Sequence, residues 1–160
     1  MKRIIIPVIA AAALTSCSNS GRVNEKAYLR AASLDGDRMT FVFYSDNDDT
    51  VTVTADSPEN ARSAAELAVG KEIFTGHTEL ILLGNCDSAE VLEFMLHKWR
   101  LSPSCMVVTG EHNGEKLLTE RGVEDLTGAL KCAQKQGKAP QCDIISVLSE
   151  ELRNIAPPIN

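Results

Sequence analysis

The sequence predicts an α+β fold, a mixed α/β arrangement in which helices pack on a mixed β-sheet within a single domain. Two observations predict it. Three short runs that read as strands follow one another between residues 27 and 55, the last two rich in β-branched or aromatic residues, and turn residues separate them. After them, helical patterns alternate with two short and strongly apolar runs, as expected for strands that are joined through helices. The 160 residues show neither an internal repeat nor a second domain.

The first three strands are predicted over residues 27–34, 39–44 and 50–55. The second run, MTFVFY, is rich in β-branched and aromatic residues. The third, TVTVTA, alternates valine with threonine and so has one apolar face. Asp, Asn, Gly and Ser occur in the two intervening segments, and these residue types favour turns. We therefore expect the three strands to form a meander.

A helix should follow the third strand. Asp56 or Ser57 can cap its first turn, Pro58 suits its first position and Gly70 can end it. Beyond it, the runs TELILLG and CMVVT are apolar enough to be strands buried on both faces. These strands are predicted over residues 78–84 and 105–109, and further helices over residues 88–99, 123–135 and 143–152.

Residues 1–16 have the features of a secretory signal. Lys2 and Arg3 give a basic start, residues 4–14 carry no charge, and small residues precede Cys17. The apolar stretch is shorter than the roughly 20 residues that a membrane-spanning helix needs. We therefore expect residues 1–16 to be removed, residues 17–25 to be a flexible tether and residues 26–160 to form the domain.

The segment Leu14-Thr15-Ser16-Cys17 resembles the lipobox of bacterial lipoproteins. The resemblance implies that the Cys17 thiol receives a diacylglycerol and that the new amino group is acylated, for example with palmitate. Two or more acyl chains anchor a protein firmly to a bilayer. The expected location is therefore the extracytoplasmic face of a membrane, with lipid contacted through Cys17. The alternative is an ordinary signal peptide in which this cysteine is incidental.

The charge of the chain bears on its partners. The formal charge of −6 becomes −8 once Lys2 and Arg3 leave with the signal. A nucleic-acid partner is not expected, because phosphate binding needs a basic surface. Electrostatic adhesion to anionic lipid is not expected either, so the lipid at Cys17 has to be the anchor.

Four further cysteines allow three full pairings, and the sequence alone does not choose between them. A disulfide between Cys132 and Cys142 is the favoured pair, because these residues flank a polar loop between two predicted helices. Buried free thiols are the alternative for Cys86 and Cys105. No C-x-x-C or C-x-x-H spacing occurs, so a zinc site is not expected.

Catalytic motifs are not evident in the sequence. His77-Thr78-Glu79 matches the H-x-E half of a zinc deaminase signature, but the P-C-x-x-C half is missing, since the later segment reads SPSCM. No G-x-S-x-G elbow, Walker A loop or Gly-rich dinucleotide turn occurs. For His77, His97 and His112, a structural role is the favoured interpretation. We therefore predict no catalytic residue, no metal ligand and no cofactor besides the lipid at Cys17.

The stretch AAELAVGKEIFTGHTELILLG, residues 64–84, carries a family resemblance. Together with the lipobox, it resembles the Ger(x)C-type spore germination lipoproteins. In that family an alanine- and leucine-rich helix leads to a Gly-His pair and then to an apolar strand that ends in glycine. In this sequence Gly76 and His77 correspond to the Gly-His pair, and Gly84 corresponds to the glycine that ends the strand. The later order, a helix like VLEFML and a strand like MVVT, is also similar.

The resemblance covers about residues 26–118 and corresponds to the N-terminal domain of the family. Two departures stand out. Ser18 and Asn19 replace the aromatic-acidic pair that often follows the lipidated cysteine, and the larger C-terminal part has no counterpart, since Pro157 and Pro158 occur about where the family would continue. If partner contacts lie in that part, this chain would be a degenerate or specialised relative.

The resemblance implies the lipoprotein subunit of a spore germinant receptor. Such a subunit has no known catalysis, and it supports assembly or signalling beside multi-pass membrane subunits that respond to small nutrients. The implied location is the spore inner membrane. The first alternative is a stand-alone surface lipoprotein that binds a solute or an envelope partner. The second is an uncharacterised enzyme, for which His77 would be the best candidate.

Overall fold

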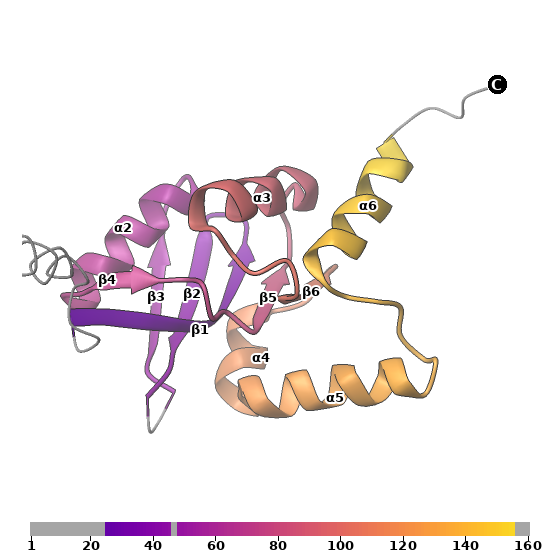
Figure 1. Ribbon diagram of the computed structural model, residues 1–160. Coiled ribbons are helices and arrows are strands. Elements are labelled where there is room, and N and C mark those ends of the chain that lie inside the picture. Colours follow the sequence, from indigo (N-terminus) through magenta and orange to yellow (C-terminus); the bar gives the residue numbers. More distant parts are fainter. Residues whose placement is uncertain (1–24, 46–47, 156–160) are drawn as a thin grey trace, which may run out of the picture.

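A six-stranded mixed sheet forms the centre of the molecule (Figure 1). The structure is a computed structural model that describes residues 25–45 and 48–155, with side chains up to Arg153. The predicted signal, the lipidation site and most of the tether therefore lie outside the described residues. The strands are β1 (Lys26–Asp35), β2 (Arg38–Phe43), β3 (Thr50–Thr54), β4 (Glu72–Phe74), β5 (Leu80–Leu83) and β6 (Met106–Thr109).

The strand order is β3-β2-β1-β5-β6, and β4 pairs with the first part of β1. The first three strands are antiparallel neighbours, as a meander requires, whereas β4 and β5 run parallel to β1 and β6 runs parallel to β5. The predicted α+β class with a mixed sheet is therefore confirmed. β1 is the central strand and is bonded along both of its sides.

A β-bulge interrupts β1 at Arg30. Leu29 pairs with Phe43 and Ala31 pairs with Val42, so two residue steps on β1 match one on β2. A bulge of this kind shifts the alternation of side chains by one residue. As a result Leu29 and Ala32 contribute to the same core cluster, while Ala31 belongs to the opposite one.

Helices cover both faces of the sheet. The helices are α2 (Pro58–Val69), α3 (Ser88–Phe94), which continues as a π-helical turn η3 (Met95–Trp99), α4 (Gly114–Arg121), α5 (Val123–Lys135) and α6 (Ile144–Ile155). Figure 1 shows α2 and α3 on one side of the sheet and α4 and α5 on the other. α6 follows a long connection from α5 and projects from the body at the β6 end.

The predicted helix after the third strand forms as expected. The Ser57 hydroxyl accepts a hydrogen bond from the Asn60 N–H at 3.3 Å, Pro58 begins α2, and Gly70 ends it with a left-handed φ of 71°. Ala61 and Ala65 are fully buried against the sheet. Small side chains at these positions let the helix axis approach the strands closely.

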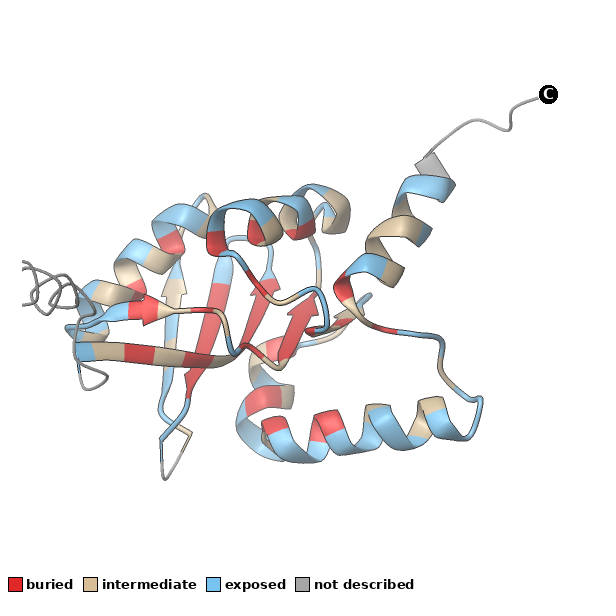
Figure 2. Cartoon of the chain, in the orientation of Figure 1, coloured by how far each residue is buried: buried red, intermediate tan, exposed pale blue. Residues whose placement is uncertain are grey.

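Two apolar clusters lie on the two faces of the sheet (Figure 2). The larger one lies between the sheet and α2, α3 and the start of α6, and the rings of Phe41 and Trp99 meet there with centroids 5.9 Å apart. The smaller one lies beneath α4 and α5. All four residues of β5 are buried, as the run TELILLG predicts, and burying one such leucine side chain contributes about 2 kcal/mol.

Two elements were not among those expected from the sequence. β4 is three residues long, and α4 fills the segment between β6 and α5. The Asn113 side chain caps α4 by accepting a hydrogen bond from the Lys116 N–H at 2.8 Å. Gly114, at the first position of α4, lies so close to β1 that an added Cβ would be 2.5 Å from the Ser33 Cβ.

Candidate functional site

The turn at Gly76 and His77 joins β4 to β5. The Phe74 ring folds back over it, and a Cβ on Gly76 would lie 2.8 Å from the ring atom Cζ of Phe74. The Thr78 N–H and hydroxyl both bond the Thr75 carbonyl, at 3.1 and 2.8 Å. The exposed His77 ring packs on Phe74 with centroids 5.5 Å apart. In this structure the Gly-His pair is thus part of a tight, packed turn.

A polar cluster adjoins this turn, built from Arg30, Tyr44, Asp48 and Glu79. The Arg30 guanidinium bonds both carboxylate oxygens of Asp48, at 2.8 and 3.0 Å, and its Nε lies 3.6 Å from Glu79 Oε1. Its Cζ lies 5.6 Å from the centre of the Tyr44 ring. The bulge of β1, the end of β2 and the start of β5 bring these side chains together.

Hydrogen bonds tie the cluster to the turn. The Tyr44 hydroxyl lies 2.7 Å from Glu79 Oε1 and 3.1 Å from the His77 carbonyl oxygen, so it can donate to either. Burial, with the Glu79 carboxylate beside it, raises the pKa of Tyr44 to about 12. Burial lowers the pKa of Arg30, but the hydrogen bond and charge of Asp48 outweigh it, so the pKa of Arg30 is raised. Both groups are therefore held in their usual protonation state at neutral pH.

A polar cleft of about 310 Å³ opens beside the same turn. His77, Glu79 and Lys131 line it, together with Ser102 and Ser104, whose hydroxyls bond each other at 2.8 Å. The Glu79 oxygen that faces the cluster is engaged by Tyr44 and Arg30. The cleft therefore presents charged and polar groups to a solute.

The structure keeps the three histidines on separate elements. His77 lies in the β4–β5 turn, His97 is exposed in η3, and His112 lies in the loop before α4, where its Nε2 is buried without a partner among the described residues. Within residues 25–45 and 48–153, no group of three or more His, Cys, Asp or Glu side chains could hold a metal ion.

The disulfide between Cys132 and Cys142 is not formed in this structure. All four cysteines of the described part are free thiols. Cys132 is exposed on α5, whereas Cys142 is buried at the sheet edge, where its carbonyl accepts the Val107 N–H at 2.6 Å. The Cys142 sulfur instead lies 3.2 Å from the Gln134 amide nitrogen. The polar loop keeps the two thiols apart, because α5 runs on to Lys135 before the chain turns back.

Cys105 is buried just before β6 begins. Burial raises the pKa of its thiol to about 12. Burial also raises the pKa of Cys86 and of Cys142. Such thiols carry little thiolate at neutral pH and are poor nucleophiles. The alternative considered for Cys86 and Cys105 is a buried free thiol. Cys105 is buried, whereas Cys86 is only partly buried and packs against the larger core cluster.

Cys17 lies outside the described residues. In the part of the chain that the structure describes, no helix combines the length and the apolar character needed to cross a bilayer. No protein-family model, curated protein or solved structure was found to match the chain.

The Arg30 cluster was not predicted from the sequence. Its four members come from three segments, since Tyr44 and Asp48 share the β2–β3 connection, and they meet through the register of β1 with β2 and β5. One signal was present, since Arg30 is a charged residue within a run that otherwise reads as a strand. A buried or half-buried charge in a strand needs a partner, and that need indicates an ion pair.

Proposed function

We propose that this chain is the membrane-anchored lipoprotein subunit of a spore germinant receptor, and that it supports receptor assembly or signalling in spore germination without catalysis. The observation that carries the proposal is the Gly76-His77 turn. In Ger(x)C-type lipoproteins an alanine-rich helix, a Gly-His pair and an apolar strand ending in glycine follow in this order. Here α2, the turn, β5 and Gly84 follow in the same order.

The geometry of the two glycines supports this match. A Cβ on Gly76 would meet the Phe74 ring, and a Cβ on Gly84 would lie 3.1 Å from Asp35 Oδ1 and 3.3 Å from the Leu34 carbonyl oxygen. Packing therefore favours glycine at Gly84, where a backbone oxygen is close, and to a lesser degree at Gly76, where the outer end of the Phe74 ring has more freedom to move. Both positions agree with the family pattern.

A non-catalytic role is consistent with what the polar side chains do. Tyr44, Arg30 and Glu79 hold the β4–β5 turn against the end of β2, and the buried thiols have raised pKa values. Ion pairs and hydrogen bonds of this kind fix the shape of a surface. A receptor subunit that assembles with multi-pass membrane proteins needs such a fixed surface near the bilayer.

The proposed anchor would hold the domain close to the membrane. Nine peptide steps separate Cys17 from Lys26, the first residue of β1, so a fully extended tether spans at most about 30 Å. A domain within this distance can reach the extracytoplasmic loops of membrane subunits.

The test is a pull-down of the lipidated protein from detergent-solubilised spore membranes, with partners identified by mass spectrometry. We expect multi-pass receptor subunits to co-purify, and Cys17→Ala to release the protein from the membrane and abolish co-purification. Cys132→Ala is the matched control, because it removes an exposed thiol outside the lipobox. Membrane association unchanged in Cys17→Ala would refute the anchor, and recovery of the protein alone would refute the receptor role.

The polar cleft beside His77 favours a second candidate, a stand-alone surface lipoprotein that binds a solute. A ligand that binds only the folded state raises the melting temperature. We would measure the melting temperature with a panel of amino acids, sugars and nucleosides, using Lys131→Ala to disturb the cleft. A rise seen with the natural chain and lost in this variant would favour solute binding.

A further inference from the structure

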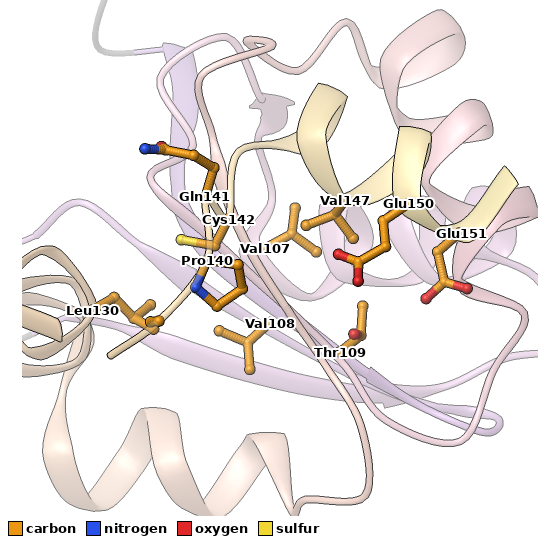
Figure 3. Close-up of a pocket in the computed structure, with 11 residues that line it drawn as sticks. Val107, Val108, Thr109, Leu130, Pro140, Gln141, Cys142, Val147, Glu150 and Glu151 are labelled. Carbon is orange, nitrogen blue, oxygen red and sulfur yellow. The ribbon is translucent and has the colours of Figure 1, made fainter. Parts of the chain in front are cut away.

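An open groove runs beside β6, at the edge of the sheet. It has a volume of about 340 Å³ and lies between β6, the end of the α5–α6 connection and α6 (Figure 3). Figure 3 shows Leu130 and Pro140 at one end, Val147, Glu150 and Glu151 at the other, and Val108 between them. The groove is separate from the cleft at the Gly76-His77 turn.

The backbone of β6 is only partly paired on this side. Its outer edge is bonded near the start, where the Val107 N–H donates to the Cys142 carbonyl and the Ile144 N–H donates to the Cys105 carbonyl. Its inner edge faces β5 and is bonded through the even-numbered residues. The Met106 N–H donates to the Glu79 carbonyl, and the Gly110 N–H donates to the Leu83 carbonyl. Alternation along a strand therefore directs the Val107 carbonyl and the Thr109 N–H outward, into the groove.

These two backbone groups have no strand beside them in the described part of the chain, because β6 ends the strand order. They lie on the same side of the strand and flank Val108. One residue of an added parallel strand can accept from the Thr109 N–H and donate to the Val107 carbonyl. An open edge of this kind is a template for strand addition by another polypeptide.

The side chains around the groove define what such a strand would carry. Val108, Leu130 and Val147 are partly exposed and offer apolar contact. Glu150 and Glu151 extend from α6 on the side of Thr109 (Figure 3). Within residues 25–45 and 48–153, neither carboxylate has a lysine, arginine or histidine partner. Charge complementarity therefore calls for a basic residue in the bound segment.

We propose that this groove binds an extended segment of a partner polypeptide, which adds to the edge of β6 and places a lysine or arginine against Glu150 and Glu151 between apolar side chains. A second copy of this chain fits less well, since pairing two β6 edges would bring together two grooves with unpaired carboxylates. The inference depends on the groove alone and is independent of the receptor role.

The test is an amide NMR titration of the mature protein, in detergent micelles if it carries the lipid. The probe is the peptide Gly-Ser-Thr-Val-Lys-Val-Thr-Ser-Gly, and its match has glutamate in place of lysine. We expect saturable shifts at Val107, Val108 and Thr109 with the lysine peptide, and binding of the glutamate peptide weaker by about tenfold or more. No saturable shift at these residues up to about 1 mM lysine peptide, or equal binding of both peptides, would overturn the proposal.

Two variants separate the contributions of backbone and charge. The double variant Glu150→Lys/Glu151→Lys should reverse the preference between the peptides, and Glu93→Lys, an exposed acid on α3, is the matched control that should not. Thr109→Pro removes the outward N–H at a strand edge, where proline is tolerated, and should abolish binding of both peptides. If Thr109→Pro does not fold, judged by its melting curve, the charge reversal alone decides. A preference unchanged in the double variant would refute the proposal.

Discussion

At the scale of single residues, a close contact at Gly114 limits which side chain the position accepts. Gly114 packs against the Cβ of Ser33, and that atom is attached directly to the backbone of β1. A side chain added there cannot be relieved by a rotamer change. Gly76 differs, because the atom it would meet is the outer end of the half-buried Phe74 ring, which has more freedom to move.

We expect Gly114→Ala to lower the free energy of unfolding by about 1–3 kcal/mol, because the added methyl group would overlap Ser33 and push α4 away from the sheet. Urea denaturation would measure the change. Gly128→Ala is the matched control, since Gly128 lies on an exposed part of α5 with nothing within 4 Å of its Cβ position, and alanine there should stabilise the helix by about 0.5–1 kcal/mol. Equal effects of the two substitutions would contradict the close contact.

At the scale of elements, the start of α6 depends on Asp143. Its carboxylate accepts the Ser146 N–H at 3.1 Å and the Ser146 hydroxyl at 2.7 Å. The side-chain hydrogen bond from Ser146 lowers the pKa of Asp143 below its usual value of 3.8. The same segment pairs with β6, since Met106 and Asp143 form an isolated antiparallel bridge. Asp143 therefore both begins α6 and fixes its position at the sheet edge.

Asp143→Ala should destabilise the protein by about 1 kcal/mol at pH 7, the usual effect of losing a helix cap. The sign of the pH dependence follows from the lowered pKa. The contribution of Asp143 is fully present above the unfolded-state pKa and is lost as the pH falls through the lower folded-state pKa. The difference between the natural chain and the variant should thus shrink below about pH 4, as chemical denaturation at several pH values would show. A difference that grows in acid would contradict this assignment.

Local sequence patterns predict most elements of this chain but miss β4 and α4. The meander, α2 and β5 follow from alternation, capping residues and a continuous apolar run. β4 has a single buried residue, Ile73, and α4 begins with glycine, so neither carries a clear local pattern. The bulge at Arg30 is also invisible to a two-residue period, because it changes that period within one strand.

The same limit applies to the sites. The Gly76-His77 turn is a local feature and can be found from the sequence, whereas the Arg30 cluster and the β6 groove arise from contacts between distant segments. Cys132 and Cys142 show the reverse case, because residues that are near each other in the sequence need not meet in the fold. They are close in sequence, but α5 and the sheet edge place them in different environments. Sequence proximity at a loop is therefore a weak guide to which thiols meet.

At the scale of the whole molecule, order should decrease from the centre of the sheet toward α6. β1 is bonded on both sides and is covered by both apolar clusters, whereas α6 projects from the body (Figure 1), and its Ile145 and Leu152 side chains are about half exposed. Regions with less buried apolar surface open with lower free energy.

We expect amide hydrogen exchange to be slowest in β1 and β5 and faster, by at least about a hundredfold, in the last two turns of α6. Mass spectrometry of peptic fragments would measure it. Binding of a strand at β6 should slow exchange at Thr109 and leave β3, at the opposite sheet edge, unchanged. Uniform exchange across the chain would contradict this gradient.

The position of β1 also determines how the fold responds to mechanical force. A pull on the chain ahead of Lys26 enters the molecule along a strand that is held by β2 on one side and by β4 and β5 on the other. Such a load is directed along the strand, so the hydrogen bonds of several ladders resist it in shear and have to break together rather than one after another. A fold that is tethered through the chain ahead of this strand would keep its shape while the surface to which the tether is attached moves.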